Sequence, residues 1–423
     1  MSEAPGARQD AAGEDRVGRA FSLRRNLRAL LVPSPGHLRP LDGLRALSIL
    51  WVMLFHAGWY AIGSLPTAGY VRLLKARWMI PFWRGDFGVD VFFVLSGFLI
   101  AGLLIDERAR TGRLALGLFY GRRLMRLWPA LLAALLLDVA LVEKHPDATW
   151  ATALYVSNFL PIGEAAMGWT WSLAIEEQFY LVCPWLVGGV ATLGGRARAG
   201  VLGGLAIGLC VLGTAIAWAG GFRAGDMEVV INRPLEPWAR AFDALYDKPW
   251  MRAGPLLTGV AAAYVLRAKG AMDALGRARA LPVVALVAAL GVAGVVTHWQ
   301  LFEGLPPAAQ AVFVGASRTA FGAAVAYVLL LSLSAHPVGR LLGRALSARA
   351  LHPVAQLAYA AYLLNPIVTQ LLYGALGPRV PSGGPETYAL LAPLSIAGTL
   401  AADAALHLAV ERPLMELRPR AAA

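Results

Sequence analysis

Apolar runs of membrane-spanning length follow one another along most of the chain, separated by short polar segments. A helix needs about 20 residues to cross the hydrocarbon core of a bilayer. Ten runs come close to this length, at residues 43–63, 87–105, 127–143, 172–192, 200–220, 252–267, 281–298, 310–334, 351–374 and 388–410. The pattern predicts an all-α polytopic transmembrane helical bundle of about ten spans, of which the sixth, at 252–267, is the shortest.

The distribution of lysine and arginine predicts how this bundle is oriented. If residue 1 is cytoplasmic, the cytoplasmic segments carry 25 Lys and Arg residues and the outer loops carry 11. Loops on the cytoplasmic side ordinarily carry the excess. We therefore expect both termini in the cytoplasm.

Three regions follow from the same pattern. Residues 1–36 are predicted to be a disordered cytoplasmic tail, 37–415 the transmembrane domain and 416–423 a short cytoplasmic tail. The end of the first tail, from Val17 to Leu31, suits either a basic amphipathic helix on the anionic membrane surface or a solvated basic segment. No signal peptide is expected, because no apolar core with a small-residue cleavage site follows a short charged start.

Composition excludes a water-soluble protein. Of the residues, 58% are hydrophobic and 15% are charged, whereas soluble domains carry about 25% charged residues. The net charge of +12 would suit nucleic acid, but the basic residues form short clusters between apolar runs, so we expect no nucleic-acid partner. The two cysteines, Cys183 and Cys210, lie inside apolar runs and predict neither a disulfide framework nor a metal site.

Ionisable residues inside the first run are the strongest sign of function, because such residues are costly in a bilayer. Arg45 and His56 are eleven positions apart, which places them on one helix face and about 16 Å apart in depth. A histidine can accept a proton, and an arginine near the cytoplasmic surface suits a phosphate. The alternative is a histidine that bonds a neighbouring helix and an arginine that reaches lipid headgroups.

Further charges flank the second and third runs. Asp90 lies near the outer end of the second run, as either a functional group or a helix-start residue. Arg122, Arg123 and Arg126 lie within about one helical turn on the cytoplasmic side. They form either a binding site for a phosphate-rich ligand or a topology signal.

Two adjacent carboxylates, Glu176 and Glu177, stand at the outer start of the fourth run. The surrounding aromatic residues are Trp169, Trp171, Phe179, Tyr180 and Trp185. Interfacial aromatic residues alone are ordinary, but carboxylates among them are less so. These carboxylates either bind a hydroxyl-rich ligand or pair with Arg318 in the eighth run.

Four sequence blocks together resemble the acyltransferase-3 family of bacterial integral-membrane O-acyltransferases. The blocks are RPLDGLRALSILWVMLFH, GVDVFFVLSGFLI, FYGRRLMRLWP and WSLAIEEQFY, between residues 39 and 180. The resemblance implies transfer of an acyl group, usually acetyl, from cytoplasmic acyl-CoA to a hydroxyl. Acceptors in the family are mostly extracytoplasmic glycans or polysaccharides, and some members acylate macrolides or other small molecules. The implied location is the bacterial inner membrane.

The resemblance also implies site residues. Arg45 and His56 match the family's Arg-x10-His pair, and Arg123 and Arg126 match its cytoplasmic Arg-x-x-Arg. Four further residues match recurrent positions, namely Asp90, Ser96, Glu176 and Glu177. One departure is Asn365, where relatives often have histidine, so no chemistry is assigned to it.

These observations combine into one scheme. Acyl-CoA is the donor substrate, with its phosphates on Arg122, Arg123 and Arg126, and His56 acts as general base or forms a transient acyl intermediate. We expect no bound cofactor and no metal. The rival function is a non-enzymatic transporter or flippase for a lipid-linked glycan, which would not explain an arginine cluster matched to a deeper histidine.

Overall fold

A computed structural model of the protein describes residues 17–34, 36–64, 67–142, 145–226, 236–380 and 384–417. Within these ranges the secondary structure is helical, with no strand, which confirms the predicted all-α class. The described residues form ten helices of 16 residues or more, and each coincides with one predicted apolar run. They are α3 (Arg39–Ser64), α6 (Phe87–Thr111), α7 (Leu116–Leu141), α9 (Trp171–Val190), α10 (Gly195–Ala219), α12 (Pro249–Arg267), α14 (Leu281–Val296), α15 (Pro307–Ser332), α17 (Leu351–Leu376) and α18 (Pro385–Leu406).

Not all of these helices have the composition of a membrane span. Among the described residues, six helical segments are long and apolar enough to cross a membrane, or seven if the bent pair α13 (Ala271–Arg277) and α14 counts as one span. The six are Arg39–Ala61, Arg77–Thr111, Leu116–Leu141, Gly195–Ala219, Pro307–Ser332 and Pro385–Leu417. The protein thus has several apolar helices of spanning length, while ten spans with both termini in the cytoplasm stay a prediction.

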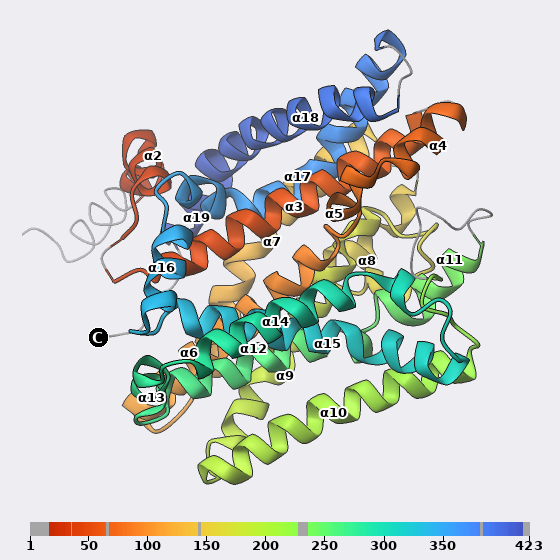
Figure 1. The fold of residues 1–423 in the computed structure, drawn as a ribbon. Helices are drawn as coiled ribbons and strands as arrows, with labels where there is room; N and C mark the ends of the chain where they lie inside the picture. Colours follow the sequence, from red (N-terminus) through yellow and green to blue (C-terminus); the bar gives the residue numbers. More distant parts are fainter. Residues whose placement is uncertain are drawn as a thin grey trace, which may run out of the picture.

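The long helices run side by side, and shorter ones gather at the two ends of the bundle (Figure 1). At one end lie α2 (Leu23–Leu31), α13, α16 (Pro337–Leu346) and α19 (Arg412–Leu417). At the other lie α4 (Thr67–Lys75), α8 (Thr149–Ala153) and α11 (Glu236–Ala241). The first end holds the segments that the charge pattern assigns to the cytoplasm.

Helices α6 and α12 pack closely against each other. A Cβ on Gly97 would collide with the carbonyl oxygen of Leu256, and a Cβ on Gly259 with that of Val94. Small residues of this kind let two helix backbones approach closely inside a membrane. The crossing fixes α6, which carries Asp90 and Ser96, in the middle of the bundle.

The tail that precedes α3 is partly helical. In α2, Asn26 and Leu30 are buried, while Leu23 and Leu27 are exposed. Arg25 of this helix lies 3.3 Å from Glu416. The segment Leu23–Leu31 is therefore an amphipathic helix, and its position on the membrane surface stays a prediction. Residues 1–16 and 418–423 of the two predicted tails lie outside the described residues.

Candidate active site

The predicted cationic residues line a cavity at the end of the bundle that holds α19. This arginine pocket has about 1560 Å³ of empty space. Its charged lining comes from α6, α7 and α19, and consists of Asp106, Glu107, Arg110, Arg122, Arg123, Arg126, Arg412 and Glu416. Arg412 is paired with Glu416 at 2.8 Å. The three predicted phosphate ligands therefore do face one cavity.

A second cavity, the central pocket, lies deeper in the bundle and has about 1340 Å³ of empty space. Arg123 and Arg126 line both pockets, so the two cavities adjoin. Helix α3 contributes Arg45 to the central pocket, and α9 contributes Glu176. Among the described residues, no carboxylate forms an ion pair with Arg45 or Arg126, which leaves both guanidinium groups for an anionic ligand.

Glu176 is held by hydroxyl donors inside this central pocket. Its Oε1 accepts short hydrogen bonds from the Ser96 hydroxyl and the Tyr180 hydroxyl. The guanidinium of Arg123 lies over the Tyr180 ring at 5.4 Å from the centroid. The arrangement links the second, third and fourth sequence blocks around one carboxylate.

The third cavity, the aromatic pocket, contains His56 and has about 1000 Å³ of empty space. Its aromatic lining consists of Phe55, Trp59, Tyr60, Trp83, Trp169, Trp171, Trp238, Phe242, Tyr246 and Tyr362. Val89 and Tyr362 line both this pocket and the central one. A series of adjoining cavities therefore runs from the arginine cluster, past Arg45, to His56.

His56 is oriented by a residue to which the sequence assigned no role. Its Nδ1 lies 3.0 Å from Oδ1 of Asn365, which α17 carries and which is 1% exposed. Its Nε2 makes no hydrogen bond to a described residue. One signal could have pointed to Asn365, because an amide is costly within an apolar run.

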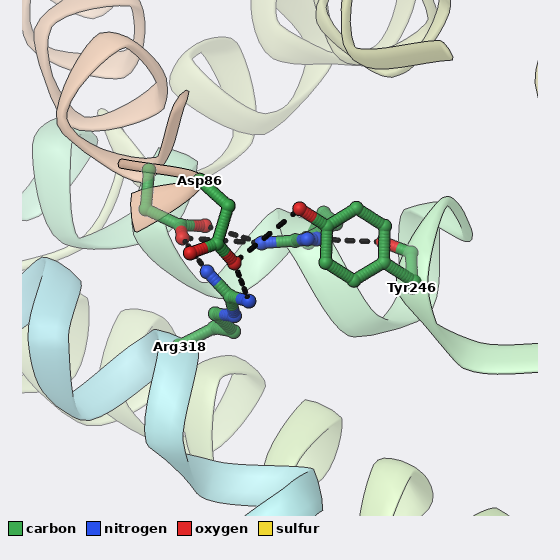
Figure 2. A network of polar contacts seen from close by, with 5 residues as sticks. Asp86, Tyr246 and Arg318 are labelled. Carbon is green, nitrogen blue, oxygen red and sulfur yellow. Dashed lines mark hydrogen bonds and ion pairs between the residues drawn. The ribbon is translucent and has the colours of Figure 1, made fainter. Parts of the chain in front are cut away.

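Asp90 lies outside the three pockets, in a buried ion-pair network (Figure 2). It accepts hydrogen bonds from Arg252 at 3.0 and 3.1 Å and from Arg318 at 2.8 Å. Arg318 also donates to Asp86, which accepts a further bond from the Tyr246 hydroxyl at 3.3 Å. The network joins α6, α12 and α15. Asp90 therefore holds these helices together and lines none of the three pockets.

The predicted pairing of Glu176 or Glu177 with Arg318 is wrong. Asp86 and Asp90 lie beside Arg318, just before and within α6, and accept its hydrogen bonds. Glu177 instead has one buried oxygen, Oε1, without a hydrogen-bond partner in the described part of the chain. Of the aromatic residues that surround Glu176 and Glu177 in the sequence, Trp169 and Trp171 line the aromatic pocket, whereas Trp185 is 67% exposed.

The segment before α12 holds part of the aromatic pocket in place. Lys248 donates to Asp247 at 2.7 Å and to the carbonyl oxygen of Asn158 at 2.5 Å. Burial raises the pKa of the Asp247 carboxyl to about 6, and the Lys248 ammonium opposes that rise. These contacts anchor η5 (Phe242–Tyr246), whose first and last residues line the pocket.

One group of residues has the composition of a metal site. His37, Asp42 and His352 place one ligand atom each within 4.8 Å of one another, near the start of α3. Asp42 accepts hydrogen bonds from the two imidazoles at 2.8 and 2.7 Å. These bonds already satisfy the carboxylate, and the group lies in none of the three pockets.

Comparison with known proteins decides the family. The Acyl_transf_3 family, described as an acyltransferase domain, matches residues 39–404. The chain belongs to this acyltransferase family. The match runs from the first residue of α3 almost to the end of α18, so the long helices, the central pocket and the aromatic pocket belong to one acyltransferase domain, while α19 adds Arg412 and Glu416 to the arginine pocket.

The curated relatives of this acyltransferase include O-acetyltransferase OatA from Staphylococcus aureus. The proteins of strain NCTC 8325 / PS 47 and of strain COL are each 35% identical to the chain over 173 residues. The match covers 36% of this chain and 25% of each relative, so the chain corresponds to about a quarter of their length. No solved structure matches the acyltransferase.

Proposed function

We propose that the protein is a bacterial inner-membrane O-acyltransferase. In this proposal it moves an acyl group, acetyl in the first instance, from cytoplasmic acyl-CoA to a hydroxyl of an extracytoplasmic glycan or polysaccharide. The observation that carries the proposal is the series of adjoining cavities that leads from the arginine cluster, past Arg45, to His56. The family and its O-acetyltransferase relatives support the reaction class.

The donor enters from the arginine pocket. The phosphates of acyl-CoA bind Arg122, Arg123 and Arg126, because hydrogen bonds between guanidinium and phosphate are charge-assisted and strong. The pantetheine arm then lies in the central pocket, beside Arg45. Arg45 and His56 are separated by about 16 Å along α3, a distance that an extended arm can cover to bring the thioester to the histidine.

His56 supplies the base. In direct transfer, its Nε2 takes the proton of the acceptor hydroxyl while the oxygen attacks the thioester carbon, and the proton then passes to the departing thiolate. In the two-step route, Nε2 itself attacks that carbon and thiolate leaves. The acceptor oxygen later displaces the imidazole, and the hydroxyl proton passes to the released thiolate. Both routes require a lone pair on Nε2.

The acceptor occupies the aromatic pocket. Sugar rings stack on aromatic faces, and the polar groups of such a pocket fix the orientation of the ligand. Trp169 and Trp171 lie in this pocket, whereas Glu176 lies in the central one. We therefore assign Glu176 to the donor side, where it holds Ser96 and Tyr180 around the pantetheine path, and Asp90 to the support of α6.

The proposal is tested by following the acetyl group. Membrane vesicles that contain the protein receive radiolabelled acetyl-CoA, and the label is recovered from glycan, lipid and small-molecule fractions as base-labile ester. Label in glycan from the wild-type protein, absent from His56→Ala vesicles, is expected. Ester in a small molecule would favour the macrolide-type acceptor. No transfer to any fraction would favour the transporter or flippase instead.

A further inference from the structure

The amide that contacts His56 is itself held by three buried hydroxyl groups, which we call the hydroxyl cluster: Thr369, Ser395 and Thr399. Thr369 lies one turn after Asn365 on α17, and the other two residues lie on the neighbouring α18. All three are 0% exposed. The proposed reaction assigns no role to them.

The hydrogen bonds of Asn365 use both ends of its amide. Nδ2 donates to Thr369 Oγ1 and to Thr399 Oγ1, each at 3.2 Å. Thr369 Oγ1 in turn lies 2.6 Å from Ser395 Oγ. Oδ1 faces His56 Nδ1 at 3.0 Å. Each N–H of the amide therefore has its own acceptor.

The opposite orientation of the amide would leave one of its N–H groups without an acceptor. If the amide were turned over, Oδ1 could accept from the two threonine hydroxyls, and one N–H could donate to His56 Nδ1. The second N–H would have no acceptor, and Asn365 is only 1% exposed, so water would not replace it. Leaving a buried donor unpaired costs about 1–3 kcal/mol. The hydroxyl cluster therefore favours the observed orientation.

We propose that the hydroxyl cluster sets the tautomer of His56 by fixing the orientation of the Asn365 amide. A carbonyl oxygen can only accept, so His56 Nδ1 must carry the hydrogen and donate it. The lone pair then lies on Nε2, the ring nitrogen that makes no hydrogen bond to a described residue, and His56 lines the aromatic pocket. The inference rests on the proposed function, because only that function needs the lone pair there.

The other tautomer would be inactive in both routes of acyl transfer. With the hydrogen on Nε2, the imidazole could neither accept the proton of the acceptor hydroxyl nor attack the thioester carbon through that atom. Thr369, Thr399 and Asn365 are thus positioning residues. Their loss should lower the rate of the chemical step and leave the binding of acyl-CoA unchanged.

A matched pair of substitutions separates the hydroxyl from the packing. Thr399→Val keeps the shape of the side chain and removes its hydroxyl, whereas Thr399→Ser keeps the hydroxyl and removes a methyl group. We expect Thr369→Val/Thr399→Val to lower kcat for acetyl transfer at least about ten-fold, which corresponds to about 1.4 kcal/mol. The KM for acetyl-CoA should stay within about two-fold, and Thr399→Ser should keep the wild-type kcat.

A second background makes the test specific for amide orientation. Asn365→Asp offers two equivalent oxygens, so one always accepts from His56 Nδ1 and orientation no longer matters. In this background, Thr369→Val/Thr399→Val should change kcat by less than about three-fold. Elution of each purified variant on size exclusion, compared with wild type, shows whether it is folded.

Three results would overturn the inference. Equal losses of kcat in the wild-type and Asn365→Asp backgrounds would mean that the threonines serve packing, and an unchanged kcat in the double valine variant would mean that they serve nothing in the reaction. An inactive but folded Asn365→Asp variant would show that an acceptor oxygen facing His56 is not enough. These three results require an active unsubstituted protein, so they count against the inference alone. An unsubstituted protein that transferred no acetyl group would count against the proposed function, and the two failures are therefore distinguishable.

Discussion

Single residues inside the bundle fall into two groups, those with charged partners and those without. Asp90 pairs with both Arg252 and Arg318, as buried charges ordinarily must be paired. Arg45 and Arg126 line cavities and have no ion-pair partner among the described residues. An anionic ligand is therefore expected beside these two arginines.

This difference predicts the effect of Arg126→Gln on donor binding. A hydrogen bond to a charged group contributes about 1.5–3 kcal/mol, so the apparent KM for acetyl-CoA should rise about ten-fold or more, with the protein still folded. Arg196→Gln is the matched control, because Arg196 is exposed near the start of α10 and lines none of the three pockets. An Arg126→Gln variant with normal KM but poor membrane insertion would make the arginine cluster a topology signal.

Residue patterns predicted one partner of each key contact but not the other. The Arg-x10-His pair and the Arg-x-x-Arg motif are local in sequence. The three pockets are lined by all four of these residues, namely Arg45, His56, Arg123 and Arg126. The partner of His56 is 309 positions away. No local pattern encodes such a contact, which depends on how α3 packs against α17.

At the scale of elements, α6 is the helix on which the site depends. Its glycines allow contact with α12, Ser96 reaches Glu176, and Asp90 joins α12 and α15 through arginines. The apolar runs predicted the helices because lipid and bundle interior both demand apolar side chains. They did not predict which helices touch, because a hydropathy pattern carries no information on helix partners. For this reason the predicted pairing of Arg318 with Glu176 or Glu177 is wrong, and Arg318 pairs with Asp86 and Asp90 instead.

The buried network predicts a large loss of stability for Asp90→Asn. Removing one partner of a buried ion pair costs about 3–5 kcal/mol, because the other charges stay buried and lose a counter-charge. Asp106→Asn on the same helix is the control, since the Asp106 side chain is 63% exposed where it pairs with Arg267. The control should lose at most about 1 kcal/mol. Equal unfolding temperatures in detergent for the two variants would contradict a structural role for Asp90.

The segment before α12 makes a prediction for pH. The pKa of Asp247 in the folded protein is about 6, above the ordinary value of about 3.9. The folded state therefore favours the protonated carboxyl. The stability that this preference contributes is fully present below the ordinary pKa and is lost as the pH rises through about 6. Over that pH range the free energy of unfolding of the wild-type protein should fall by up to about 3 kcal/mol more than that of Asp247→Asn. The unfolding temperature of the wild-type protein should therefore fall more steeply with pH than that of Asp247→Asn. Equal pH dependence of the two unfolding temperatures would contradict the prediction.

On the scale of the whole molecule, the three adjoining pockets run from the end of the bundle that holds α19 into its interior. The charge pattern assigns that end to the cytoplasm, and the family assigns the chain to membrane acyltransferases. The acyl group would then cross most of the membrane within one protein. Hydropathy predicted the bundle, but the arrangement of its adjoining pockets depends on side chains from five long helices and could not be read from the sequence.

Membrane topology follows from the same account. If there are ten spans, reporter fusions at residue 235 and at the C-terminus should report opposite sides of the membrane, with the C-terminal fusion cytoplasmic. The count of 25 cytoplasmic against 11 outer Lys and Arg residues is the basis of this expectation. Both fusions on one side would mean that the number of spans between them is even, with α12 the first helix to reconsider.

The central claim is that acyl-CoA reaches His56 from the arginine pocket and reacts there. The direct measurement is the release of free thiol from acetyl-CoA by the purified protein, with water or an added hydroxyl compound as acceptor. Wild type should release thiol, and folded His56→Ala should do so at least about a hundred-fold more slowly, the range expected for loss of a general base. A folded His56→Ala protein that releases thiol at the wild-type rate would contradict the account.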